Sequence, residues 1–170
     1  MDSKNNKYFF NNNEYSLASV DISFLRTMKG YNKGWEEDIV TSNKKEGNHF
    51  YTFLRNGEKI AIVGVSVRAG KWFSHTYVHQ DYRGELTGAI AVKALCIKFN
   101  IKILYIEIQK TSVDFIKFLK RTGIKEVVKT PLQRKNFKKI NKFINNLTPM
   151  RVFRVDSDKL NLEEWKNGIH

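Results

Sequence analysis

The stretch that decides the fold runs from residue 78 to residue 89 and reads Val-His-Gln-Asp-Tyr-Arg-Gly-Glu-Leu-Thr-Gly-Ala. A segment rich in aromatic and β-branched residues precedes it, and apolar residues at three- and four-residue spacing follow it. It therefore predicts a loop between a strand and a helix. Gly84 and Gly88 let an anion approach the main chain, and Arg83 can add charge-assisted hydrogen bonds at the helix N-terminus. This outline favours phosphate binding, although a plain strand-to-helix turn shares it.

The residues before this loop predict antiparallel strands joined by tight turns. The expected strands are 15–20, 49–54, 59–68 and 72–79. Asn56-Gly57 favours a type I′ hairpin, and Ala69-Gly70-Lys71 a second tight turn. Asp21 is expected to cap a helix that reaches Met28, with a second helical piece at 35–40. Residues 1–13, rich in Asn and Lys, are expected to form a ragged lead-in.

The residues after the loop predict alternating helices and strands. The expected helices are 88–99, 113–121 and 137–144, and the expected strands are 103–108, 125–128 and 150–155. The chain has no internal repeat and no linker-like stretch. We therefore expect one domain over residues 1–170, of the α+β class, with a helical crossover through its middle.

Two stretches in this order resemble the GNAT (Gcn5-related N-acetyltransferase) family. In that family a central strand ends in valine, a Tyr-Arg-Gly loop follows, and the next helix begins on the pyrophosphate of acetyl-CoA; Val78, Tyr82-Arg83-Gly84 and Gly88-Ala89 match. Residues 112–127 resemble the family's Asn-x-x-Ala-x-x-Phe-Tyr-x-x-x-Gly-Phe-x-x-Val segment. The resemblance covers residues 50–128 well and the rest loosely.

The resemblance implies a mixed central sheet flanked by helices, and an N-acyltransferase that moves an acyl group from acetyl-CoA to an amine. It implies that the donor is bound by a set of residues around the glycine loop and at the next helix. These are Val78, Arg83, Gly84, Thr87, Gly88, Ala89 and Ser112.

Several residues depart from the family pattern. Leu86 stands where the loop usually has its middle glycine, and Leu119 where a tyrosine often protonates the CoA thiolate. The predicted strand 72–79 contains no glutamate, although many members keep their base there. The alternative to an enzyme is therefore a non-catalytic GNAT-like module that binds nucleic acid or protein.

Three side chains are candidates for the missing catalytic groups. His75 has an intrinsic pKa suited to a base, Glu107 on the next strand is the other candidate base, and Tyr77 can replace the missing tyrosine. Each has an ordinary structural explanation as well: a hydrogen-bonded histidine, an exposed strand carboxylate and a packed aromatic ring.

The charge of the chain is large and uneven. The net charge is +13, and residues 110–154 hold 13 lysines and arginines against only Asp114 and Glu126. Such a block attracts phosphate-rich partners, so we expect a nucleic-acid surface formed by Arg134, Lys135, Lys138, Lys139 and Lys142. By fold and charge the chain is also similar to Mom-type phage proteins that modify DNA. A solvated basic face, with a protein lysine or a small amine as acceptor, is the alternative.

Composition limits the remaining classes. Cys96 is the single cysteine and no apolar run approaches a membrane span, so we expect a cytoplasmic protein. The four histidines and Cys96 show no metal-ligand spacing, and we expect no metal.

Overall fold

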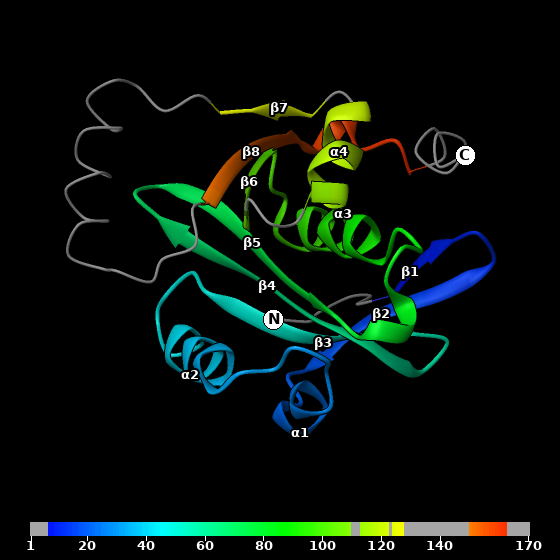
Figure 1. Ribbon diagram of the computed structural model, residues 1–170, viewed down its shortest axis with the longest axis vertical. Helices are drawn as coiled ribbons and strands as arrows, with labels where there is room; N and C mark the ends of the chain where they lie inside the picture. The colour runs from blue at the N-terminus through cyan, green and yellow to red at the C-terminus, as the bar shows by residue number, and fades with distance from the viewer. Residues whose placement is uncertain (1–6, 110–112, 123, 128–149, 163–170) are drawn as a thin grey trace.

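A computed structural model describes residues 7–109, 113–122, 124–127 and 150–162 (Figure 1). The strands are β1 Lys7–Phe10, β2 Asn13–Ser19, β3 His49–Arg55, β4 Glu58–Arg68, β5 Lys71–Val78, β6 Ile103–Gln109, β7 Lys125–Glu126 and β8 Met150–Asp156. The helices are α1 Ile22–Arg26, α2 Lys33–Ser42, α3 Thr87–Phe99 and α4 Val113–Arg121, with short 3-10 turns at Gln80–Tyr82 and Ser157–Lys159.

The described strands form one mixed sheet in the order β1-β2-β3-β4-β5-β6-β8-β7. Neighbours from β1 to β5 are antiparallel, β5 and β6 are parallel, and β8 lies antiparallel between β6 and β7. The parallel pair requires a crossover, which α3 supplies. The predicted α+β class with a mixed sheet is therefore confirmed.

Two hairpin turns use asparagine in the left-handed region. Asn56 and Gly57 have φ of 50° and 84°, as the type I′ prediction requires. Asn11 and Asn12 have φ of 48° and 60° and make a second such turn between β1 and β2. The expectation of a ragged lead-in is therefore wrong for residues 7–10, because asparagine tolerates this backbone and lets β1 fold back onto β2. Residues 1–6 lie outside the described part.

The sheet is covered on both faces (Figure 1). On one face Ala61 and Val63 of β4 share a buried cluster with Leu95 of α3. On the other face Ile62 packs in a second cluster with Leu25 of α1 and Ile39 of α2. Residues 60–65 are buried within β4, which explains why that strand is nearly all apolar.

Helix α3 is the buried centre of the fold. Eight of its side chains are buried, and Cys96 is one of them with 4% of its surface exposed. Burial raises the pKa of the Cys96 thiol to about 11. This confirms that Cys96 is a core residue, as expected from its position among Ala94, Leu95 and Ile97.

Helix α1 begins as the sequence predicts. Asp21 accepts a hydrogen bond from the Phe24 N–H at 3.0 Å and forms an ion pair with Lys59. Within the described residues no helix has the length and apolar character needed to cross a membrane. The predicted helix at 137–144 falls outside them.

Gly64 provides a test of how tightly β3 and β4 pack. A Cβ at this position would lie 2.5 Å from Phe50 Cδ1 and 2.7 Å from the His49 carbonyl oxygen. We expect Gly64→Ala to lower the free energy of unfolding by about 1–3 kcal/mol, the usual cost of overpacking. Chemical denaturation measures it. Gly88→Ala is the control, since its Cβ meets only Thr76 Cγ2 at 3.8 Å; equal losses in both variants would contradict the prediction.

Candidate active site

Strands β5 and β6 pair for only three residues and then separate. Trp72–Ser74 lie opposite Leu104–Ile106, and no further pairing joins the two strands in the described residues. Each strand keeps its other neighbour beyond this point, because β4 pairs with β5 as far as Val78 and β8 pairs with β6 as far as Gln109. A gap therefore opens at the carboxyl ends of the two parallel strands.

The gap has an unpaired strand edge along one wall. His79 lies opposite Ile60 at the end of the ladder between β4 and β5. The His79 N–H donates to the Ile60 carbonyl at 2.9 Å, so these two residues form a hydrogen-bonded pair. Hydrogen-bonded and non-hydrogen-bonded pairs alternate along an antiparallel ladder. Val78 and Thr76 therefore direct their N–H and C=O groups away from β4 and into the gap.

The glycine loop follows directly after β5. Gly84 has φ of 89°, and Leu86 has φ of 59° and ψ of 8°, in the left-handed region. Leu86 therefore keeps the backbone path that a glycine would take, at a cost of about 1–2 kcal/mol, and its side chain packs against the core. Thr87 begins α3, and its hydroxyl donates to the Tyr82 carbonyl at 2.9 Å; its contact with a donor stays a prediction.

Arg83 lies at the mouth of the gap. Its Nε donates to the Val78 carbonyl at 3.1 Å, and its Nη2 donates to the Lys29 carbonyl at 2.9 Å. The side chain is exposed. The structure thus brings Val78, Arg83 and the loop glycines together, and contact of Arg83 with a pyrophosphate stays a prediction.

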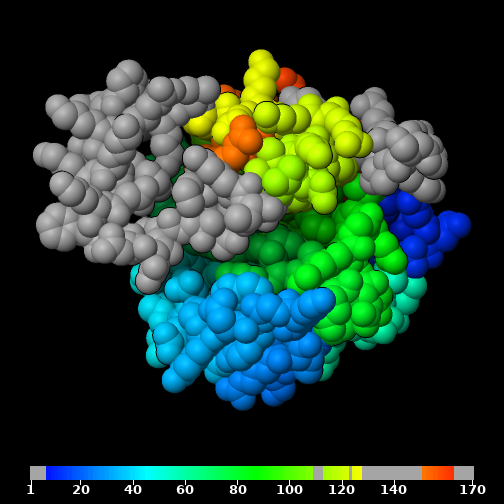
Figure 2. Space-filling view, in the orientation of Figure 1, coloured from blue at the N-terminus to red at the C-terminus, as the bar shows by residue number. Residues whose placement is uncertain are grey.

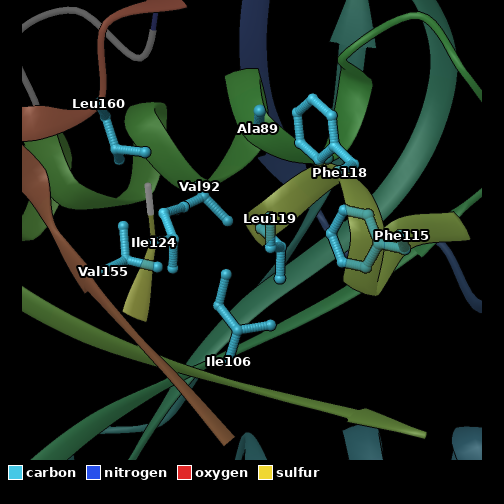
Figure 3. A pocket seen from close by; sticks show the side chains of 10 residues that line it. Ala89, Val92, Ile106, Phe115, Phe118, Leu119, Ile124, Val155 and Leu160 are labelled. Carbon is cyan, nitrogen blue, oxygen red and sulfur yellow. The ribbon is translucent and has the colours of Figure 1, made fainter. Parts of the chain in front are cut away.

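Helices α3 and α4 enclose an apolar cavity of about 20 Å³ beside the gap (Figure 3). Gly88 and Ala89 of α3, Ile106 of β6, and Phe115 and Phe118 of α4 are among its lining residues. Leu119 also lines it and is 2% exposed. Figure 2 shows the surface hollowed between α1–α2, in blue, and α4, in yellow-green, with green atoms on the floor.

His75 and Glu107 come directly after Ser74 and Ile106, the last residues that pair β5 with β6. His75 Nε2 lies 2.8 Å from Ser66 Oγ, and its ring packs on Phe50. Burial lowers the pKa of His75, Arg68 lowers it further, and Glu107 and Asp38 oppose the shift. The imidazole is therefore neutral near pH 7.

Glu107 is held in an ion pair. Its Oε2 accepts from Arg68 Nη2 at 2.7 Å, and the Arg68 guanidinium lies 3.7 Å from the centre of the Phe73 ring. Phe73 in turn contacts Tyr105 at 5.5 Å between ring centres. The carboxylate is thus fixed in direction, and sequence reasoning missed Arg68 because nothing in its pattern marks a cross-strand partner 39 residues away.

Tyr77 packs on α2. Its ring centre lies 4.8 Å from that of Trp35, and burial raises the pKa of its phenol to about 12. The phenol therefore keeps its proton at neutral pH. Ser74 and Thr76, which the sequence analysis did not single out, have their hydroxyl oxygens 3.4 Å apart where the strands separate.

Some predicted residues lie outside the described part of the chain. These are Ser112 and the proposed nucleic-acid surface, Arg134, Lys135, Lys138, Lys139 and Lys142. Among the residues that are described, no three His, Cys, Asp or Glu side chains are grouped so as to hold a metal ion.

The burial of His75 predicts a pH dependence of stability. Its folded pKa lies below the usual 6.5, so the unfolded state takes up this proton at higher pH than the folded state. The stabilisation is fully present above about pH 6.5 and is lost as the pH falls through the folded pKa. We expect Tm to fall between pH 7 and pH 5, and to fall less in His75→Gln, which can still bond Ser66. Thermal unfolding measures this; an unchanged pH profile in the variant would count against it.

Comparison with known proteins supplies the fold. The sequence matches no protein-family profile and no curated protein. Among solved structures, an uncharacterized protein from Bacillus halodurans is similar with a TM-score of 0.65 and 12% identity, over 96% of this chain and 97% of that one. The GNAT domain of S. lividans PAT gives 0.58 and 12%, over 85% and 90%. The Campylobacter jejuni N-acetyltransferase PseH, solved with acetyl coenzyme A, gives 0.54 and 9%, over 84% and 98%. The chain therefore has the fold of GNAT acetyltransferases.

Proposed function

We propose that this protein is an N-acyltransferase that transfers an acetyl group from acetyl-CoA to an amine. The observation that carries the proposal is the gap between β5 and β6, with an unpaired strand edge beside a glycine loop that starts α3. An extended ligand with amide groups can add to such an edge as a strand does, and its pyrophosphate can bind the free N–H groups of α3. The fold shared with PseH, which was solved with acetyl coenzyme A, supports this donor.

The donor would bind along the gap, with its amides on Val78 and its pyrophosphate on the loop. Gly84 leaves the loop open, since a Cβ there would meet no atom within 4 Å. Arg83 would contribute its charge, and Gly88 and Ala89 would let the pantetheine lie close to α3. Ser112, which the resemblance assigns to donor binding, is proposed to complete the donor site.

The reaction forms a C–N bond and breaks the C–S bond of the thioester. The amine nitrogen attacks the thioester carbonyl carbon, loses a proton to a base, and the departing sulfur takes a proton. A neutral His75 can accept the amine proton, with Glu107 as the alternative base. The N–H group of Thr76 is suited to stabilise the oxyanion, and the protonated Tyr77 phenol is proposed to supply the proton to sulfur.

Leu119 favours the second candidate, a non-catalytic GNAT-like binding module. It stands where the family often has its proton donor, and it is buried in an apolar cavity. Calorimetry with acetyl-CoA, followed by mass spectrometry of cellular DNA, RNA and protein after expression, separates the two. Acetyl-CoA binding with a new acetylated amine supports the enzyme, and acetyl-CoA binding without any acetylation supports the module. No acetyl-CoA binding would overturn the proposed activity.

Arg83 is the side chain through which the donor site is best tested. We expect Arg83→Ala to weaken CoA binding by about 1.5–3 kcal/mol, the range for a hydrogen bond to a charged group. Calorimetry measures it. Arg154→Ala is the control that removes the same charge, because Arg154 is exposed on β8 and lies opposite Tyr105 of β6, not beside the glycine loop. Unchanged affinity in Arg83→Ala would remove Arg83 from the donor site.

We further propose that the acceptor amine belongs to a nucleic acid. The support is the charge of residues 110–154 and the net charge of +13. Likeness to Mom-type phage proteins rests on the same fold and charge and on nothing finer. Phosphate contacts of this kind hold a nucleic acid in place without reading its sequence.

Salt dependence tests this acceptor. We expect binding to duplex DNA or RNA at low salt, with a log–log salt slope of magnitude roughly 3 to 6, because each neutralised phosphate adds about 0.9. Replacing Lys138, Lys139 and Lys142 with Gln should lower both the affinity and the slope and leave CoA binding intact. Absence of binding at ~50 mM salt, where screening is weak, would return the acceptor to proteins or small amines.

A further inference from the structure

The connection between α1 and α2, residues 27–32, is bonded directly to the glycine loop. The Lys29 N–H donates to Gln80 Oε1 at 2.8 Å, and the Lys29 carbonyl accepts from Arg83 Nη2 at 2.9 Å. Both backbone polar groups of Lys29 are therefore held by side chains from the segment that follows β5, Gln80 and Arg83. A third contact is the stacking of the His79 ring on Phe24 of α1, with 5.7 Å between ring centres.

The direction of each hydrogen bond follows from the Lys29 N–H, which can only donate. Gln80 Oε1 must accept, so Gln80 Nε2 is the donor toward His79 Nε2, 3.0 Å away. His79 Nε2 is then the accepting nitrogen, and the ring proton of the neutral form lies on Nδ1. That nitrogen faces Asp81 Oδ2 at 3.5 Å. Gln80 thus has one defined orientation, fixed at both ends.

Arg83 uses one edge of its guanidinium for these contacts. Nε and Nη2 donate to the Val78 and Lys29 carbonyls. A guanidinium carries five N–H donors in a rigid fork. The Nη1–Nη2 edge is therefore left for a phosphate. A phosphate bound there would hold the Arg83 side chain in the position from which it donates to the Lys29 carbonyl.

We propose that Gln80 and Arg83 couple the donor site to the connection between α1 and α2, so that CoA binding at the glycine loop orders residues 27–32. This inference rests on the proposed function, because it takes CoA as the ligand of that loop. Gln80 is a positioning residue: it acts on Lys29 and does not itself contact the donor. Coupling of this kind is reciprocal, so a ligand that orders residues 27–32 would also tighten CoA binding.

Hydrogen exchange of the full chain, with and without CoA, tests the coupling. In the wild type we expect CoA to slow amide exchange at residues 84–88 and also at residues 27–32, the latter by about two- to tenfold, the effect of stabilising one hydrogen bond. Gln80→Ala should reduce the slowing at 27–32, because only the Arg83 contact with Lys29 remains, and preserve the slowing at 84–88. Gln80→Glu is the matched variant: its carboxylate still accepts from the Lys29 N–H, and the slowing at 27–32 should return.

The two proposals fail in different ways. If CoA slows 84–88 and leaves 27–32 unchanged, or slows 27–32 equally in Gln80→Ala, the coupling is overturned and the donor site stands. If CoA slows neither segment, the donor site is overturned and the coupling with it.

Discussion

The short parallel pairing of β5 with β6 is the constraint on which the rest of the molecule depends. Three residues of each strand hold the two halves of the sheet together, and the pairing stops at Ser74 and Ile106. Because β4 and β8 continue to pair beyond this point, each strand stays extended while the gap opens. The unpaired backbone is thus a product of the sheet itself and needs no special residue to hold it open.

The elements around the gap serve different purposes on its two sides. Helix α3 covers one face, and the glycine loop, the apolar cavity and the N–H groups of its first turn lie on this side of the gap. The opposite face carries His75 with Ser66, and Glu107 with Arg68, in fixed orientations. The separation places the glycine loop and a set of titratable groups on two sides of one opening.

Much of this arrangement could be predicted from the sequence, and the failures have physical causes. Periodicity located the strands and helices of the described residues, because a strand buried on both faces and an amphipathic helix leave distinct patterns. The strand at 7–10 was missed because an Asn-rich stretch looks disordered, yet Asn11 and Asn12 are suited to the left-handed turn that β1 needs. Leu86 departs from the family's glycine in sequence, yet it adopts the left-handed backbone that a glycine takes readily.

The site residues show the same division. The glycine loop and Arg83 could be located from the sequence because they are local. The partners Ser66, Arg68 and Lys29 could not, because cross-strand register and loop packing decide them and neither leaves a local pattern. A site residue that its type and local sequence mark could be predicted from the sequence. A pair of residues that lie far apart in the chain could be found only from the fold.

Because Cys96 is buried, the rate at which its thiol reacts with a reagent can measure opening motions of the fold. Its thiol is buried in the core cluster to which α3 contributes, and its raised pKa leaves almost no thiolate at neutral pH. A thiol-reactive reagent would therefore label the folded protein only when the core around α3 opens. Since the chain has one cysteine, the labelling rate reports that single event without any engineered residue.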